Sequence, residues 1–118
     1  MADYTIWHNP KCTTSRFVLQ ALQDAGVSLM VRDYQAQPPT VAELRAALDR
    51  LGMAPRDLLR RRNTPYDDLG LGDPALTDDA LIAAMAEHPA VIERPVVFGP
   101  RAARLCRPKE TVFDMLAG

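Results

Sequence analysis

The first third of the chain carries two short apolar runs separated by one amphipathic stretch. Residues 4–7 form a β-prone run that ends in a polar loop beginning at His8. Apolar side chains then recur at helical spacing from Phe17 onward, and Gly26 stops the pattern. A second β-prone run covers residues 29–34. A strand, a helix and a strand within this length predict a βαβ unit, whose crossover makes the two strands parallel. Three polar residues are candidate N-caps of the helix: Thr13, Thr14 and Ser15.

The middle of the chain has the pattern of helices. Thr40 and Glu43 have the spacing of a capping box, and the apolar positions that follow predict a helix up to Gly52. Pro55 opens a further turn through Leu58 and Leu59. A third helix is expected after Thr77, and the pair His88-Pro89 ends it.

The last part of the chain returns to β structure. Residues 95–98 predict a strand, which turns at Gly99-Pro100 into an antiparallel partner at residues 103–106. Pro108 suits the first turn of a final helix. The order β-α-β, helical insertion, β-β-α predicts an α/β protein with a mixed sheet, and it is the order of a thioredoxin-like fold. With 118 residues, we expect residues 1–118 to form a single domain.

Composition excludes several classes of protein. Hydrophobic residues make up 47% of the chain and charged residues 25%, so the chain has the composition of a globular protein. A net charge of −1 gives no general attraction for nucleic acid or anionic lipid. Neither a signal peptide nor a membrane-spanning run is recognisable, so we expect a cytoplasmic protein. We also expect it to be a monomer. Two cysteines are too few for a disulfide scaffold or a structural zinc site, and no metal site is expected.

Cys12 is the candidate nucleophile. It lies where a strand ends and a helix starts, and there free backbone amides and the helix dipole stabilise a thiolate. A protonated His8 nearby would add to this effect. The alternative is a small buried cysteine in a turn, but the polar loop around Cys12 favours the reactive interpretation.

Residues Cys12 to Ser15 have the spacing of a redox C-x-x-C motif with serine in place of the second cysteine. No local disulfide can form, so an external thiol must resolve any adduct of Cys12. Cys106 lies in a predicted strand, and we expect it to belong to the core rather than to act as the resolving thiol. Two uses of Ser15 remain open, a hydrogen bond to the Cys12 thiolate and the capping of the helix.

A more specific pattern runs through the chain in ordered blocks: residues 4–16, 58–60, 65–71, 88–89, 93–97 and 104–108. Together these blocks resemble the glutaredoxin-linked arsenate reductase family, in its short form without a C-terminal tail. The resemblance implies a thioredoxin-like oxidoreductase of arsenic detoxification, with Cys12 as nucleophile and His8 as its electrostatic tuner. It also implies glutathione as co-substrate, glutaredoxin as partner and no bound cofactor.

The resemblance further implies that Arg60, Arg94 and Arg107 form an oxyanion clamp, with Ser15 beside it. Guanidinium groups suit this task because they hold oxyanions through paired, charge-assisted hydrogen bonds. Thioredoxin-like folds also carry a cis-proline that opens a strand beside the active cysteine, and Arg94-Pro95 is the candidate here.

Two other functions remain open. Lys11 and Thr13 make the loop bulkier and more basic than in many members of that family, which is compatible with a glutathione-dependent thiol reductase acting on another substrate. A non-catalytic interaction module similar to the Spx-like regulators, which share the fold, is the third hypothesis. Such regulators typically carry C-x-x-C in this loop, and Ser15 breaks that motif.

Overall fold

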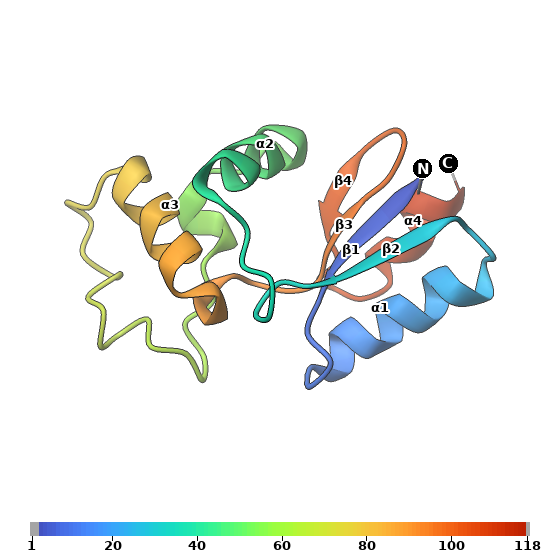
Figure 1. Ribbon diagram of the computed structural model, residues 1–118, viewed down its shortest axis with the longest axis horizontal. Coiled ribbons are helices and arrows are strands. Elements are labelled where there is room, and N and C mark those ends of the chain that lie inside the picture. Colours follow the sequence, from blue (N-terminus) through green and yellow to red (C-terminus); the bar gives the residue numbers. More distant parts are fainter. Residues whose placement is uncertain (1–2, 118) are drawn as a thin grey trace. The chain divides into compact units, whose positions relative to one another are not determined.

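The computed structural model describes residues 3–117, which form two compact units (Figure 1). The first unit contains the chain up to Gln37 and from Arg94 onward, and the second is Pro38–Glu93. The first unit holds β1 (Tyr4–His8), α1 (Thr13–Asp24), β2 (Leu29–Asp33), β3 (Val96–Phe98), β4 (Ala103–Leu105) and α4 (Thr111–Ala117). The second holds α2 (Val41–Leu51), the 3₁₀ helix η1 (Pro55–Leu58), α3 (Asp78–Glu87) and the 3₁₀ helix η2 (Pro89–Val91).

The sheet of the first unit has the strand order β2-β1-β3-β4. β1 pairs in parallel with β2, and it pairs antiparallel with β3, which forms an antiparallel hairpin with β4. The predicted mixed sheet, parallel βαβ unit and C-terminal hairpin are confirmed. This topology brings the last residues of β1, β2 and β4 and the first residue of β3 to one end of the sheet.

Helices α1 and α4 cover one face of the sheet. The helices pack against the sheet through a cluster of fully buried side chains: Ile6, Val18, Leu22, Val97, Cys106 and Val112. Burying each of the larger aliphatic side chains stabilises the fold by about 1.5–3 kcal/mol. The cluster fixes α1 against β1, and it therefore also fixes the loop that joins them.

The second unit is the predicted helical insertion. The capping box of α2 is present, with Thr40 Oγ1 accepting from the backbone N–H of Glu43 and Glu43 Oε1 accepting from that of Thr40. Gly52 ends α2 in the left-handed conformation at φ 66°, which glycine adopts without strain. An antiparallel bridge between Leu59 and Ile92 joins the two ends of the unit.

Some local boundaries differ from the prediction. Cys12 is the N-cap of α1, in place of the three polar residues after it, and β1 extends to His8. Pro108 does not lie in the first turn of α4, which begins at Thr111. A tight turn precedes the helix, and in it the Thr111 N–H donates to Pro108 O. The peptide bonds before Pro95 and Pro108 are both cis. Within residues 3–117, none of the helices has the length and apolar character required to span a membrane.

Candidate functional site

Four segments meet at one end of the sheet. The loop after β1 carries Cys12, Tyr34 follows β2 directly, Arg94 precedes β3, and Arg107 follows β4. The strand pairings place Asp33, Val96 and Leu105 at this end, so these segments converge although they are far apart in the sequence. The sheet topology thus places three of the predicted site residues, Cys12, Arg94 and Arg107, at the same end of the sheet.

Cys12 lies at the positive end of α1. Its backbone N–H donates to Asn9 O at 3.0 Å, and its own carbonyl accepts the first helical hydrogen bond, from Arg16 N–H, at 3.0 Å. The thiol is partly exposed. No acidic side chain lies in the first turn of α1, and the Arg16 guanidinium holds Pro10 O of the loop at 3.1 Å. The start of α1 therefore carries positive potential that no acidic side chain of its first turn offsets, and this potential would attract an anion.

Ser15 holds the loop together from inside. Its side chain is fully buried, and its Oγ lies 2.6 Å from His8 Nδ1 and accepts from Asn9 N–H at 3.0 Å. Of the two uses that the sequence left open for Ser15, capping is wrong, since α1 is capped at Cys12. The hydroxyl instead ties the end of β1 to the first turn of α1. A hydrogen bond from Ser15 to the Cys12 thiolate stays a prediction.

His8 is almost completely buried at the end of β1. Burial lowers the pKa of His8 below 6.5, Arg16 lowers it further, and Asp33 only partly opposes these effects. The imidazole is therefore mainly neutral at neutral pH. Electrostatic tuning by a protonated His8 would require a lower pH, and at neutral pH the ring instead acts as the hydrogen-bonding partner of Ser15.

Arg94 and Arg107 are linked to each other. Arg94 is only 6% exposed, and its Nε donates to Tyr34 Oη at 2.6 Å. Arg107 Nη1 donates to the backbone carbonyl of Arg94 at 3.0 Å. Beside them, a hollow of about 240 Å³ is lined by Thr14 and residues 107–110. This unit therefore places two guanidinium groups at the same sheet end as Cys12.

Arg60 belongs to the second unit. Its Nη1 lies 2.8 Å from Glu93 Oε1, and its backbone N–H donates to Val91 O at 2.7 Å. The two side chains are 17% and 20% exposed, so the ion pair is largely shielded from water. Its part in an oxyanion clamp stays a prediction.

Cys106 lies in the core cluster, as expected. Its side chain is fully buried, and its Sγ is 4.0 Å from Met115 Sδ. Burial raises the pKa of the Cys106 thiol to about 12, although the charge of Arg104 acts in the opposite direction. A thiol that stays protonated and has no access to solvent is a poor nucleophile.

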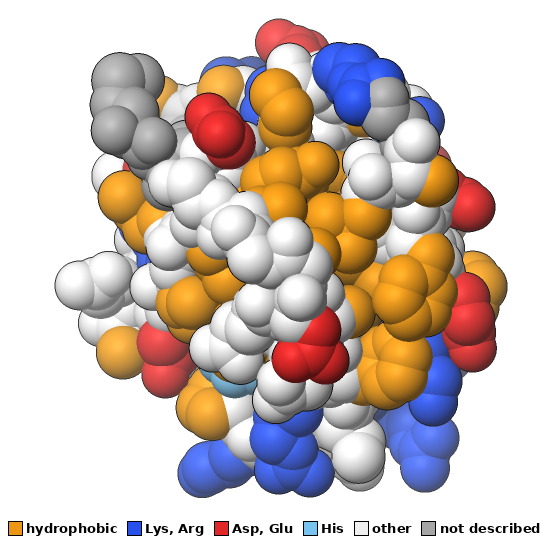
Figure 2. Space-filling view, turned by 90° about the vertical axis from the view of Figure 1, so that its right-hand side faces the viewer, with side chains coloured by type: hydrophobic (Ala, Val, Ile, Leu, Met, Phe, Trp, Pro, Cys, Tyr) orange, Lys and Arg blue, Asp and Glu red, His pale blue; other side chains and the backbone are white. Residues whose placement is uncertain are grey.

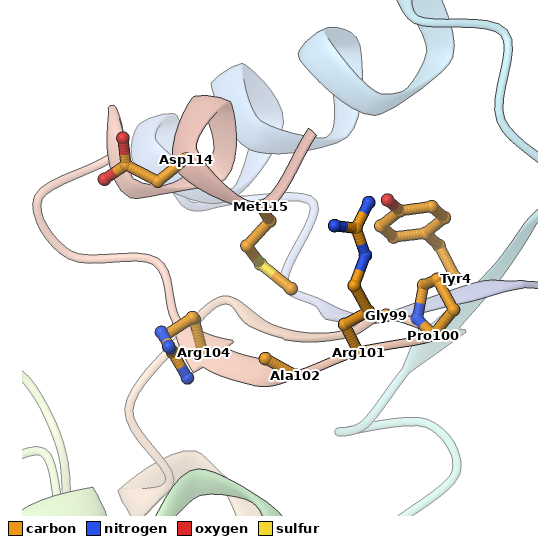
Figure 3. A pocket seen from close by; sticks show the side chains of 8 residues that line it. All are labelled: Tyr4, Gly99, Pro100, Arg101, Ala102, Arg104, Asp114 and Met115. Carbon is orange, nitrogen blue, oxygen red and sulfur yellow. The ribbon is translucent and has the colours of Figure 1, made fainter. Parts of the chain in front are cut away.

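A second hollow, of about 140 Å³, lies at the opposite end of the sheet (Figure 3). It is formed by Tyr4, the β3–β4 turn, Arg104, Asp114 and Met115. A Cβ at Gly99 would lie 3.0 Å from the Tyr4 ring, so a side chain at this position would fit only if the ring shifted. Because β1 begins here and ends near Cys12, this hollow is not part of the candidate site.

The surface of α1 and α4 carries an exposed aromatic pair. Phe17 and Phe113 are 36% and 49% exposed and meet edge to face at 5.9 Å, and Lys109 Nζ lies 4.6 Å from the Phe17 ring centre. Figure 2 shows hydrophobic side chains gathered on this side of the molecule. Among residues 3–117, no group of three His, Cys, Asp or Glu side chains could hold a metal ion.

The sequence interpretation missed Tyr34. Its signal was its position, because a residue that directly follows a strand parallel to β1 must lie at the sheet end that carries Cys12. Its partner Arg94 is 60 residues away, so local patterns could not pair the two.

The fold and the site define a thioredoxin-like protein with one partly exposed cysteine at a helix start and two arginines at the same end of the sheet. The sequence profile described as the ArsC family matches residues 7–115. The chain belongs to the ArsC family.

Individual relatives extend over nearly the whole chain. The arsenate reductase of Rhizobium meliloti (strain 1021) is 46% identical over 95% of this chain and 80% of its own length. That of Escherichia coli (strain K12) is 42% identical over 98% of this chain and 82% of its own. The solved structure of an arsenate reductase from Vibrio cholerae superposes with a TM-score of 0.90 at 43% identity, covering 96% of this chain and 97% of its own.

Proposed function

We propose that the protein is an arsenate reductase that uses Cys12 as nucleophile, glutathione as co-substrate and glutaredoxin as protein reductant. The observation that carries the proposal is the position of Cys12 at the start of α1, at the sheet end where Arg94 and Arg107 also lie. The names of its curated relatives support arsenate as the oxyanion.

Binding comes first. Arsenate is a tetrahedral anion, and an anionic thiolate reaches its arsenic only if the negative charge of the oxygens is offset. Guanidinium groups keep their charge at every relevant pH, and the start of α1 adds backbone N–H donors. Arg94, Arg107 and the helix end supply this field without moving at the moment of reaction.

Two sulfur exchanges complete the chemistry. The Cys12 thiolate attacks arsenic, an S–As bond forms, and one arsenate oxygen leaves as water after protonation. Glutathione thiolate then attacks the Cys12 sulfur. An S–S bond forms, the S–As bond breaks, and its electron pair stays on arsenic, which leaves as arsenite. A glutaredoxin thiolate attacks the glutathione sulfur of this mixed disulfide and releases Cys12 as thiolate.

The chain itself explains why an outside thiol is required. Ser15 stands where a second cysteine of the motif would lie, and its buried hydroxyl is bonded within the loop. Cys106 is buried in the core cluster with a raised pKa. Neither residue is suited to resolve an adduct of Cys12.

The test is a coupled assay with glutathione, glutaredoxin, glutathione reductase and NADPH. Arsenate-dependent oxidation of NADPH is expected for the wild type, and Cys12→Ser abolishes it whereas Cys106→Ser retains most of it. Alanine variants of Arg60, Arg94 and Arg107 test the clamp one residue at a time. Absence of arsenate-dependent oxidation with active coupling enzymes would overturn the proposal.

A glutathione-dependent reductase of another substrate is the second candidate. Lys11 and Thr13 are both exposed beside Cys12, and the Lys11 N–H is fixed by Asn9 Oδ1 at 3.0 Å. They present a bulky, basic rim that a larger anionic thiol adduct would contact. Rapid reduction of a glutathionylated substrate, without turnover of arsenate, would favour this candidate.

A further inference from the structure

Tyr34 is a buried phenol for which neither the motif nor the proposed chemistry gives a role. It is fully buried, and its hydroxyl oxygen accepts a hydrogen bond of 2.6 Å from Arg94 Nε. The guanidinium carbon of Arg94 lies 5.9 Å from the Tyr34 ring centre, so the ring also faces the cation.

The sheet brings the two residues together. Tyr34 follows β2 and Arg94 precedes β3, and these two strands flank β1 on either side. Their hydrogen bond therefore joins the strands that border the end of β1. Arg107 Nη1 extends the link by donating to Arg94 O, so a shift of Arg94 would also move the anchor of Arg107.

Because Arg94 is buried, its hydrogen bond to Tyr34 favours one orientation of the guanidinium group. Arg94 is only 6% exposed, so the loss of hydration around its charge costs free energy unless protein acceptors replace the water. Among residues 3–117, every buried side-chain nitrogen and oxygen has a hydrogen-bond partner. Because Nε lies at the inner side of the guanidinium fork, a bond there limits rotation of the planar group and sets the direction of its outer edge.

We propose that Tyr34 is a positioning residue for the oxyanion site, whose hydroxyl holds the Arg94 guanidinium in its anion-binding orientation before the anion arrives. This inference rests on the proposed function, in which Arg94 binds the oxyanion. Preorganisation of this kind strengthens binding because no donor has to be ordered at that moment.

The experiment measures how arsenate protects Cys12 from alkylation by iodoacetamide in the full-length protein. Tyr34→Phe keeps the ring and removes only the hydroxyl. The arsenate concentration for half protection is expected to rise about tenfold, the effect of disordering one charged hydrogen-bond donor. The alkylation rate of Cys12 without arsenate is measured for each variant and serves as its own reference. Turnover should show the loss in KM for arsenate more than in kcat.

The matched control is Tyr4→Phe. Tyr4 lies in the same unit as Tyr34, but it lines the hollow at the opposite end of the sheet (Figure 3). Arsenate should therefore protect Cys12 of Tyr4→Phe as well as it protects Cys12 of the wild type. In the Arg94→Ala background, Tyr34→Phe should add no further loss of protection, because the residue that it orients is absent. Additive effects of the two substitutions would assign Tyr34 a merely structural role and overturn the inference.

A measurement on the wild type keeps the test independent of how the variants fold. The Arg94 Nε–H signal in NMR should be protected from solvent exchange both with and without arsenate. A signal that gains protection only when arsenate binds would overturn the inference. If arsenate protects Cys12 equally in the wild type and in Tyr34→Phe, only the role of Tyr34 is refuted. If arsenate does not protect Cys12 of the wild type at all, the proposed function is refuted as well.

Discussion

The Ser15 hydroxyl allows a stability prediction worked from two distances. Ser15→Ala removes the hydroxyl that lies 2.6 Å from His8 Nδ1 and 3.0 Å from the Asn9 backbone nitrogen. Ser15 is fully shielded from solvent. A buried polar group left without its partner costs about 1–3 kcal/mol, and the higher helix propensity of alanine returns about 0.5 kcal/mol. For one such group the expected loss is therefore about 0.5–2.5 kcal/mol in the free energy of unfolding, and the partly buried Asn9 N–H adds less.

Urea unfolding followed by far-UV circular dichroism measures this loss. A loss of that size is a large part of the stability of a small protein, so the midpoint should fall clearly while the slope with denaturant stays unchanged. Thr13→Ala is the matched control, since Thr13 is exposed on the same turn of α1, and its effect should stay within about 0.5 kcal/mol. If the two variants unfold at the same midpoint, the loop is not held by Ser15 as described.

Three further outcomes are expected. Burial lowers the pKa of His8, so the unfolded chain binds its proton more tightly, and stability should be lost as the pH falls through 6.5 toward the lower folded-state pKa. As the pH is lowered, the urea midpoint should fall less steeply for His8→Gln than for the wild type or the control His88→Gln. An equal pH dependence in all three proteins would contradict the assignment. Because Cys106 is buried with a pKa of about 12, mass spectrometry of iodoacetamide-treated protein should find it labelled only after denaturation, and labelling in the native protein would show that the core opens. Glu93→Gln removes the carboxylate from a shielded pair with Arg60 and should destabilise the protein by about 1–2 kcal/mol in the same urea assay, whereas an unchanged midpoint would mean that the pair contributes nothing.

The sheet end explains why Cys12, Arg94 and Arg107 are found together. Parallel pairing of β1 with β2 and antiparallel pairing with β3 make their ends coincide, and β4 returns to the same end. The motif around Cys12 predicts the nucleophile, and the strand pairings bring the arginines of this unit to the same end of the sheet.

The local elements could be predicted from the sequence, because their signals lie within a few residues of one another. The capping box of Thr40 and Glu43, the left-handed Gly52 and the apolar spacing of α1 each act over one or two helical turns. The same holds for Cys12, whose place between a strand and a helix is readable from the neighbouring residues. Boundaries were less certain, as Cys12 itself became the N-cap.

The pairing of side chains that are distant in the sequence depends on the folded chain. The bond between Tyr34 and Arg94 spans 60 residues, and the ion pair of Arg60 with Glu93 spans 33. The pKa of His8 depends on how deeply the folded chain buries the ring, a quantity that no short motif encodes. Such contacts depend on which strands pair and which groups lose water, and these are properties of the whole folded unit rather than of any segment.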